Sequence, residues 1–187
     1  MVEIRVERSD RRSIGMTIKN ENLVVVRAPL RMSKYEIERF IQAHQGWLQS
    51  HLAKMRAQKA KAESMPIDDA RIEELKKKAK EVIPPRAAFW AEKLGVDYGR
   101  ISIRCQKSKW GSCSAKGDLN FNCLLMLCPE ACIDYVVIHE LCHRKEMNHS
   151  ARFYAYVESV MPNWRQARAW LKNEGQALIA ARFSEED

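Results

Sequence analysis

Three of the five histidines in this chain lie within eleven residues, close to one glutamate. They are His139, His143 and His149, and Glu140 directly follows the first of them. On an α-helix, residues four apart lie on one face, so His139 and His143 can present two imidazoles to a single ion. Glu140 is rotated by about 100° from His139 and can take a proton from water on the open side of that ion. The pattern His-Glu-x-x-His therefore predicts a metal site with a general base beside it.

The third histidine predicts a turn after the metal-binding helix. On a continued helix, His149 would point away from His143 and lie about 9 Å further along the axis. We expect the chain to leave the helix after about Lys145 and to turn back, with Asn148 in the left-handed conformation. Three neutral imidazoles with an open fourth position are the ligand count of a catalytic zinc site, so we expect one zinc ion per chain. Glu158 is the alternative third ligand, or a residue that orients a liganding histidine.

The residues before this motif favour a metal-ligand role for its histidines. Helical histidine pairs can also be plain surface residues. Residues 135–138 are apolar, however, which indicates a partly buried helix. Burying two unpaired imidazoles costs free energy, so a ligand role is the better explanation. Cys142 faces away from the histidine pair at helical spacing, and we expect it to be a small buried hydrophobe rather than a nucleophile.

Further residues connect this motif with a known family. The segment Trp110-Gly111-Ser112-Cys113-Ser114 precedes it, Asn122 and Pro129 lie between, and Asn148-His149-Ser150 closes it. Together they resemble the YgjP-like (WSS-type) metallopeptidase family, and the resemblance spans nearly the whole chain. It implies a zincin-type fold with one zinc ion. The motif is also similar to the metzincin pattern His-Glu-x-x-His-x-x-Gly-x-x-His, although Glu146 stands where that pattern has glycine.

The resemblance also suggests where a substrate binds. In zincins, a sheet edge beside the metal-binding helix typically binds an extended substrate by strand addition. We therefore expect the Trp110 loop or a neighbouring strand to line the cleft. The candidate substrate-binding or supporting residues are Trp110, Gly111, Ser112 and Asn122. Equally, Trp110 can be a core anchor and Gly111 only a turn residue.

Hydrophobic periodicity predicts an α+β fold. Residues 2–6, 13–19 and 23–27 have the pattern of strands, and a capping box at Ser33 and Glu36 opens a long helix. This N-terminal part, residues 1–65, is expected to pack on the catalytic part.

Residues 66–187 are expected to form the zincin-like catalytic domain. A helix restarts at Pro66, should break or kink at Pro84-Pro85, and ends at Gly95. Alternating apolar residues predict strands over 101–105 and 119–125, joined by a long connection. The metal-binding helix then begins at Pro129 and packs on this small sheet.

Composition and charge bound the remaining possibilities. The chain of 187 residues is 46% hydrophobic and 30% charged, as in ordinary globular proteins. It has neither an apolar run near 18 residues nor a signal-peptide core, so we expect a cytoplasmic protein without a membrane partner. The six cysteines fit that compartment as free thiols. The net charge of +8 favours a nucleic acid or nucleotide partner, unless the basic side chains simply coat the helices.

These observations predict a zinc-dependent peptidase that acts on a peptide or protein. One alternative keeps the site and changes the substrate to a nucleoside triphosphate, since a nucleotide pyrophosphatase activity is attached to members of the family that the chain resembles. Against it, the chain lacks both a Gly-x-x-x-x-Gly-Lys loop and an acidic cluster for magnesium. The second alternative is a basic nucleic-acid-binding module in which zinc is structural.

Overall fold

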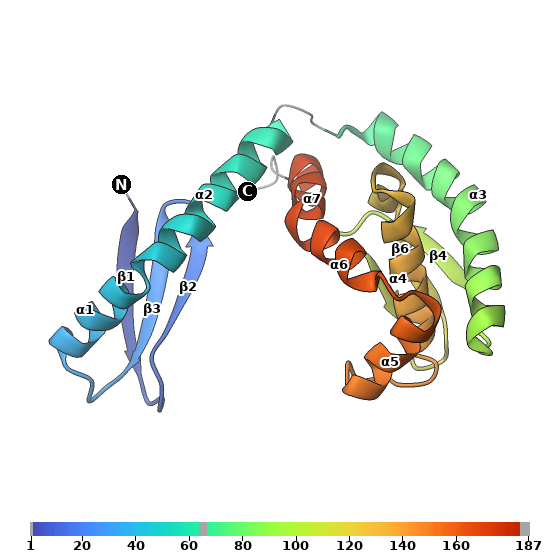
Figure 1. Ribbon diagram of the computed structural model, residues 1–187. Coiled ribbons are helices and arrows are strands. Elements are labelled where there is room, and N and C mark those ends of the chain that lie inside the picture. Colours follow the sequence, from blue (N-terminus) through green and yellow to red (C-terminus); the bar gives the residue numbers. More distant parts are fainter. Residues whose placement is uncertain (1, 64–66, 184–187) are drawn as a thin grey trace. The chain divides into compact units, whose positions relative to one another are not determined.

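The computed structural model describes residues 2–63 and 67–183 (Figure 1). Its internal contacts divide the chain into two compact units, Met1–Ala60 and Lys61–Asp187. Both units combine a small sheet with helices, which confirms the α+β class. The boundary predicted between residues 65 and 66 and the helix start predicted at Pro66 lie outside the described residues.

A three-stranded sheet begins the first unit. Its strands are β1 (Glu3–Ser9), β2 (Gly15–Asn20) and β3 (Leu23–Pro29), in the order β1-β3-β2. The central strand β3 pairs in parallel with β1 and antiparallel with β2. Val24 and Val26 alternate along β3 and are both fully buried, as expected for one face of a strand that packs against helices.

Two helices follow this sheet, α1 (Lys34–Ala43) and α2 (Gln45–Glu63). The apolar stripe that predicts one long helix is thus divided between two. The predicted capping box is confirmed: the Ser33 hydroxyl accepts from the Glu36 backbone N–H at 3.2 Å, and the Glu36 carboxylate accepts from the Ser33 N–H at 2.8 Å. The helix residues that pack on the buried face of β3 are Ile37, Leu48 and Leu52.

The second unit opens with its longest helix, α3 (Asp69–Leu94). Its ends follow the sequence closely. The Asp68 carboxylate caps the first turn by accepting from the Arg71 N–H at 2.8 Å. Gly95 ends the helix in the left-handed conformation, with φ of 62°.

The break predicted at Pro84-Pro85 is wrong, because α3 continues through both prolines. A proline frees the carbonyl group one turn earlier. Here the two residues one turn earlier are exposed, so water can bind their carbonyl groups. On the other face, Ile83 and Ala87 are fully buried in the core of the unit. Packing on both sides of the prolines therefore holds the helix together.

The second sheet has the order β4-β6-β5. β4 (Ile101–Arg104) pairs in parallel with β6 (Leu119–Asn122), and β5 (Gly111–Cys113) pairs with it antiparallel. The predicted strand over 119–125 ends earlier, because the chain turns at Asn122 into a 3-10 helix over Cys123–Leu127. The edge strand β5 lies in the segment that the sequence predicts as a loop.

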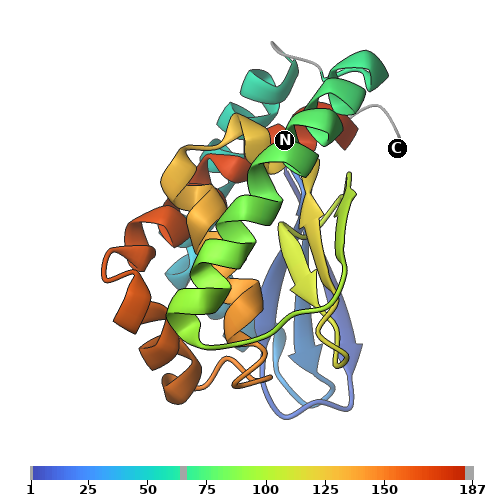
Figure 2. The ribbon, with the colours of Figure 1, turned by 90° about the vertical axis from the view of Figure 1, so that its right-hand side faces the viewer.

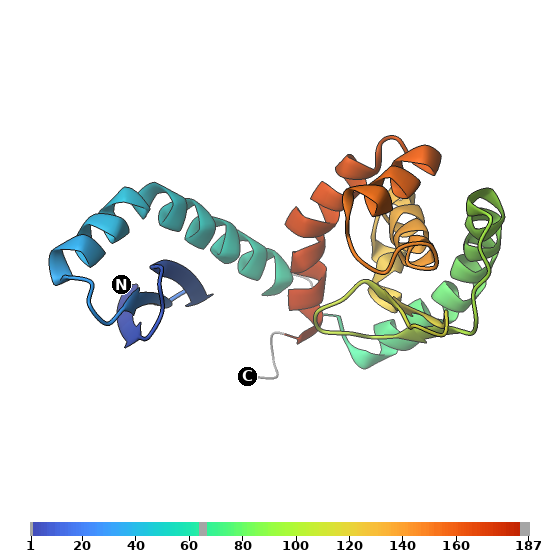
Figure 3. The same cartoon turned by 90° about the horizontal axis from the view of Figure 1, so that it is seen from below.

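Helix α4 (Glu130–Cys142) forms the centre of the second unit. Three helices complete the chain: α5 (Ala151–Val160), α6 (Trp164–Asn173) and α7 (Gly175–Phe183). Figure 2 shows α3 running beside these helices on one side of the second sheet, and Figure 3 shows α4 between α3 and the α6–α7 pair. Because α4 is surrounded, it is apolar around nearly its whole circumference.

All six cysteines lie in the second unit, and all six are free. Cys142 is fully buried, as predicted for a small hydrophobe, and burial raises the pKa of its thiol to about 12. It therefore stays protonated near neutral pH and is a poor nucleophile.

No helix within residues 2–63 and 67–183 combines the length and the apolar character needed to cross a bilayer.

Candidate active site

The last turn of α4 carries His139 and Glu140. The preceding residues Val137 and Ile138 are fully buried, so the helix enters the core before it presents these two side chains. Glu140 is only 6% exposed, whereas His139 is half-buried at the edge of a cavity. The helix therefore holds a carboxylate and an imidazole side by side where the core meets solvent.

The chain turns directly after α4 and returns to it. His143 is the C-cap residue of α4, and its Nδ1 lies 3.2 Å from the carbonyl oxygen of Glu146. His149 stands just before Ser150, which caps the start of α5. No described non-glycine residue has a positive φ, so the left-handed conformation predicted for Asn148 is wrong. Because the helix ends three residues before Lys145, the connection is long enough to reverse with ordinary backbone angles.

This turn brings the three imidazoles together. One ring nitrogen from each of His139, His143 and His149 lies within 4.8 Å of the other two. The Nε2 atoms of His139 and His149 are 2.9 Å apart. The buried ring of Phe153 lies against all three, with centroid distances of 4.8, 4.7 and 4.9 Å. Phe153 thus fixes the imidazoles from behind while their nitrogens converge.

The chemistry of this donor set fits a divalent metal ion. Burial, together with smaller electrostatic effects of His143 and His149, lowers the pKa of His139 to about 3. Burial also lowers the pKa of His143. Both rings are therefore neutral near pH 7, which is the form that binds metal. Three converging imidazoles match a catalytic zinc site with an open position.

Glu140 lies against the edge strand β5. Burial raises the pKa of its carboxyl group to about 8, and the positive charge of Lys109 opposes part of this shift. A Cβ atom added at Gly111 would lie 2.8 Å from both Cγ and Oε1 of Glu140. Glycine at this position therefore lets the strand pass close to the carboxylate, so Gly111 has a steric role beyond that of a turn residue.

The other candidate residues, Trp110, Ser112 and Asn122, lie in three different environments. Trp110 lines a cavity, and its ring also packs on α7, where a Cβ at Gly175 would lie 2.8 Å from its Cζ2. Ser112 lines a cavity beside the three histidines. Asn122 is fully buried, and its side-chain amide donates to the carbonyl oxygens of Gln106 and Lys109, both at 2.9 Å. Asn122 thus supports the Trp110 loop from below.

Glu158 is not brought to this group. It lies exposed on α5, and its carboxylate accepts a hydrogen bond from Arg165 Nη1 at 2.6 Å. The metal-competent group found among the described residues contains the three histidines only.

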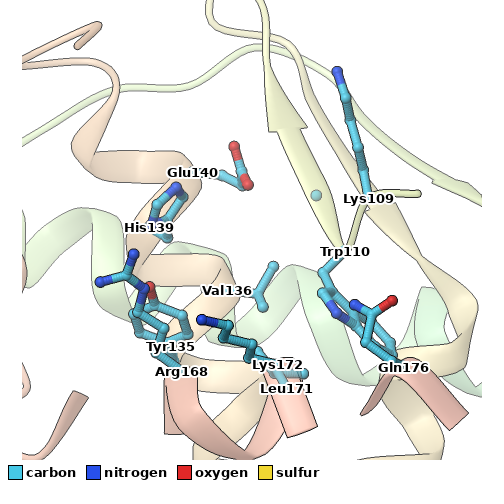
Figure 4. A pocket seen from close by; sticks show the side chains of 11 residues that line it. Lys109, Trp110, Tyr135, Val136, His139, Glu140, Arg168, Leu171, Lys172 and Gln176 are labelled. Carbon is cyan, nitrogen blue, oxygen red and sulfur yellow. The ribbon is translucent and has the colours of Figure 1, made fainter. Parts of the chain in front are cut away.

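Two cavities of about 360 Å³ each flank Glu140. Lys109, Gly111, His139 and Glu140 line both of them, so together they form one cleft. Figure 4 shows the cavity on the Trp110 side. It includes residues that the sequence reasoning missed, namely Tyr135, Arg168, Lys172 and Gln176.

Of these missed residues, only Tyr135 had a signal in the sequence. It precedes His139 by one helical turn, and the two ring centroids are 5.7 Å apart. Arg168 and Lys172 come from α6, and nothing local in the sequence relates that helix to the motif.

The solved structures that are similar to this chain include two metallopeptidase zymogens. Abylysin from Pyrococcus abyssi is 25% identical over 50% of this chain and 96% of its own, with a TM-score of 0.45. Jannalysin from Methanocaldococcus jannaschii is 20% identical over 49% of this chain and 95% of its own, with a TM-score of 0.44. A comparison with curated proteins finds no match.

A family model described as "YgjP-like, metallopeptidase domain" matches residues 12–73 and 63–174. The match includes the histidines, Glu140 and the Trp110 segment, and it covers most of the chain. The resemblance drawn from the motifs is thereby confirmed. The chain belongs to the YgjP-like family of zinc metallopeptidases.

Proposed function

We propose that His139, His143 and His149 hold one zinc ion and that Glu140 is the general base in peptide-bond hydrolysis. The observation that carries this proposal is the convergence of three imidazole nitrogens beside a buried carboxylate. All four residues belong to the unit Lys61–Asp187, which we propose as the catalytic part of the chain.

The chain's own contribution to the reaction is proton transfer. Zinc, when bound, supplies Lewis-acid chemistry: it lowers the pKa of water at its open position and polarises the scissile carbonyl group. Glu140 accepts a proton from the attacking water and delivers it to the leaving amine. Burial raises the pKa of this carboxyl group to about 8, close to the range in which one group can both accept a proton and deliver it again.

The edge strand β5 supports a peptide as the substrate. In the second sheet, β5 pairs with β6 on one side only, and its Gly111 lies against Glu140. An extended peptide can add to the free edge through backbone hydrogen bonds, as in other sheet-edge complexes. Such a peptide would pass along the cleft with its backbone beside the proposed base.

The test combines metal content with turnover. The purified protein should contain about one zinc per chain by elemental analysis, and His143→Ala should lose it. Glu140→Gln should keep the zinc and lose hydrolysis of a peptide library by about 10²-fold or more. Wild-type turnover in Glu140→Gln would contradict the role of this residue. A protein without zinc, even after zinc is supplied, would overturn the metal site.

A further inference from the structure

The cavity on the Trp110 side of Glu140 has an apolar floor and a basic rim. Val136 of α4 and Leu171 of α6 form part of the floor. Arg168 and Lys172 reach in from α6, on the side of Tyr135 and His139 (Figure 4). We call this cavity the basic pocket.

Three lysine or arginine residues line the basic pocket, and two of them come from one face of one helix. Arg168 and Lys172 are four residues apart on α6, so their side chains lie one turn apart on the same side. The Arg168 guanidinium lies over the rings of Tyr154 and Trp164, 5.4 and 5.7 Å from their centroids. This stacking holds the guanidinium in place without neutralising its charge.

No carboxylate balances these charges. Within the part of the chain that the structure describes, neither Arg168 nor Lys172 forms an ion pair. Glu140 is the only acidic residue that lines the basic pocket, and it is the proposed base. Two like charges held one turn apart repel each other, and an anion bound between them removes that cost.

The position of β5 sets the direction of a bound peptide. The basic pocket is lined by Lys109 and Trp110, which precede β5, whereas the second cavity is lined by Ser112 and Cys113 at its end. Antiparallel addition is the more stable pairing for a new strand. A peptide antiparallel to β5 runs from the Cys113 end towards the Trp110 end. Its residues after the scissile bond therefore reach the basic pocket.

We propose that the basic pocket selects substrates with a carboxylate on the C-terminal side of the scissile bond, held by Arg168 and Lys172. The carboxylate can belong to an aspartate or glutamate side chain or to the C-terminus of a short peptide. This inference rests on the proposed peptidase function and adds the substrate class to it.

Binding tests the basic pocket without turnover. The Glu140→Gln protein keeps the pocket, so labelled peptides that differ only by Glu, Gln or Lys at one position can be compared by fluorescence anisotropy. We expect the glutamate peptide to bind about tenfold more tightly than the glutamine peptide, with the difference shrinking as salt screens the charges. Adding Lys172→Glu should reverse the order and favour the lysine peptide. Adding Lys78→Glu is the control, because it makes the same charge change at an exposed position of α3.

Cleavage-site profiling of a peptide library by mass spectrometry provides the second readout. Wild type should show acidic residues enriched just after the cleaved bond, and Arg168→Gln or Lys172→Gln should lose that enrichment. Peptides with amidated and free C-termini separate the two sources. Enrichment that survives amidation assigns the carboxylate to a side chain, and enrichment that needs the free terminus assigns it to the C-terminus.

Two results would overturn this inference alone. One is cleavage that depends on Glu140 but shows no preference for acidic residues after the cleaved bond, or shows the same preference in Lys172→Glu as in wild type. The other is a Lys172→Glu variant that loses its affinity for a nucleotide probe but binds acidic peptides as before. That result would make the basic pocket a phosphate site. If a zinc-loaded wild type cleaves no peptide in the library, the proposed function fails, and the inference fails with it.

Discussion

Glu140 and Gly111 depend on each other although they are 29 positions apart in the sequence. The carboxylate is buried because β5 approaches so closely, and the strand can approach only because residue 111 has no side chain. Burial in turn raises the pKa of the carboxyl group from its ordinary acidic range towards neutral pH, where a proton can be both accepted and released. At this scale, a glycine without any functional group shapes the chemistry of its neighbour.

Gly111→Ala should therefore damage activity more than stability. The new Cβ would lie 2.8 Å from Glu140 Cγ, so the carboxylate must move. A displacement of about 1 Å at a reacting group costs roughly 10²-fold, and we expect kcat/KM on a cleaved peptide to fall by about that factor. Gly46→Ala is the matched control, because an added Cβ there meets no atom within 4 Å. Equal activities of the two variants would contradict the steric coupling.

Phe153 is a second residue without a functional group that affects the site through its contacts with other side chains. Its ring touches all three imidazoles and carries no donor or acceptor. Phe153→Leu keeps the site apolar but removes part of that surface, so the histidines gain freedom. We expect zinc affinity, measured by competition with a chelating dye, to fall by about tenfold. Phe183→Leu, at the end of α7, should leave zinc affinity unchanged. If both variants bind zinc like wild type, Phe153 does not orient the ligands.

At the scale of elements, the site lies between the buried helix α4 and the short edge strand β5, whose position depends on the loop that precedes it. α4 brings the first two histidines and Glu140, and β5 brings the free edge. Asn122, the last residue of β6, connects that strand to the loop before β5. Its side-chain amide donates to two carbonyl groups of the loop and its side-chain oxygen accepts from the Leu124 N–H. The loop position therefore depends on one buried amide.

Asn122→Ala should destabilise the second unit by about 2–3 kcal/mol, because it leaves two partly buried carbonyl groups and the buried Leu124 N–H without their side-chain partner. Urea unfolding would measure this change in the free energy of unfolding. Asn120→Ala is the comparison, since that half-buried side chain donates one hydrogen bond, to Gln106 Oε1 at 3.0 Å. It should cost about 1 kcal/mol or less. The opposite ranking of the two variants would show that Asn122 does not anchor the loop.

At the scale of the whole molecule, the proposed base and the proposed metal ligands belong to one of the two compact units. Zinc that binds only the folded site adds its binding free energy to the stability of that unit. The first unit has its own small core around β3 and shares none of the ligands. Metal should therefore act on the two units differently.

Removing zinc with a chelator should lower the melting temperature of the second unit. Zinc at about 100 times its Kd stabilises a site by about 2.7 kcal/mol, which corresponds to roughly 10 °C for a unit of this size. Differential scanning calorimetry with and without chelator would measure the shift, and His143→Ala should abolish it. A shift of the same size in His143→Ala would mean that zinc binds elsewhere.

The sequence alone determined what depends on near neighbours. The spacing of His139 and His143 puts two imidazoles on one helical face, and the capping residues set where helices begin and end, because these contacts span one turn. The tertiary structure decided what depends on distant packing: the approach of Gly111 to Glu140, the continuity of α3 through its prolines, and the cations that α6 adds to the pocket. Those features arise only when segments far apart in the chain bury each other's surfaces, and no local pattern records which segments will meet.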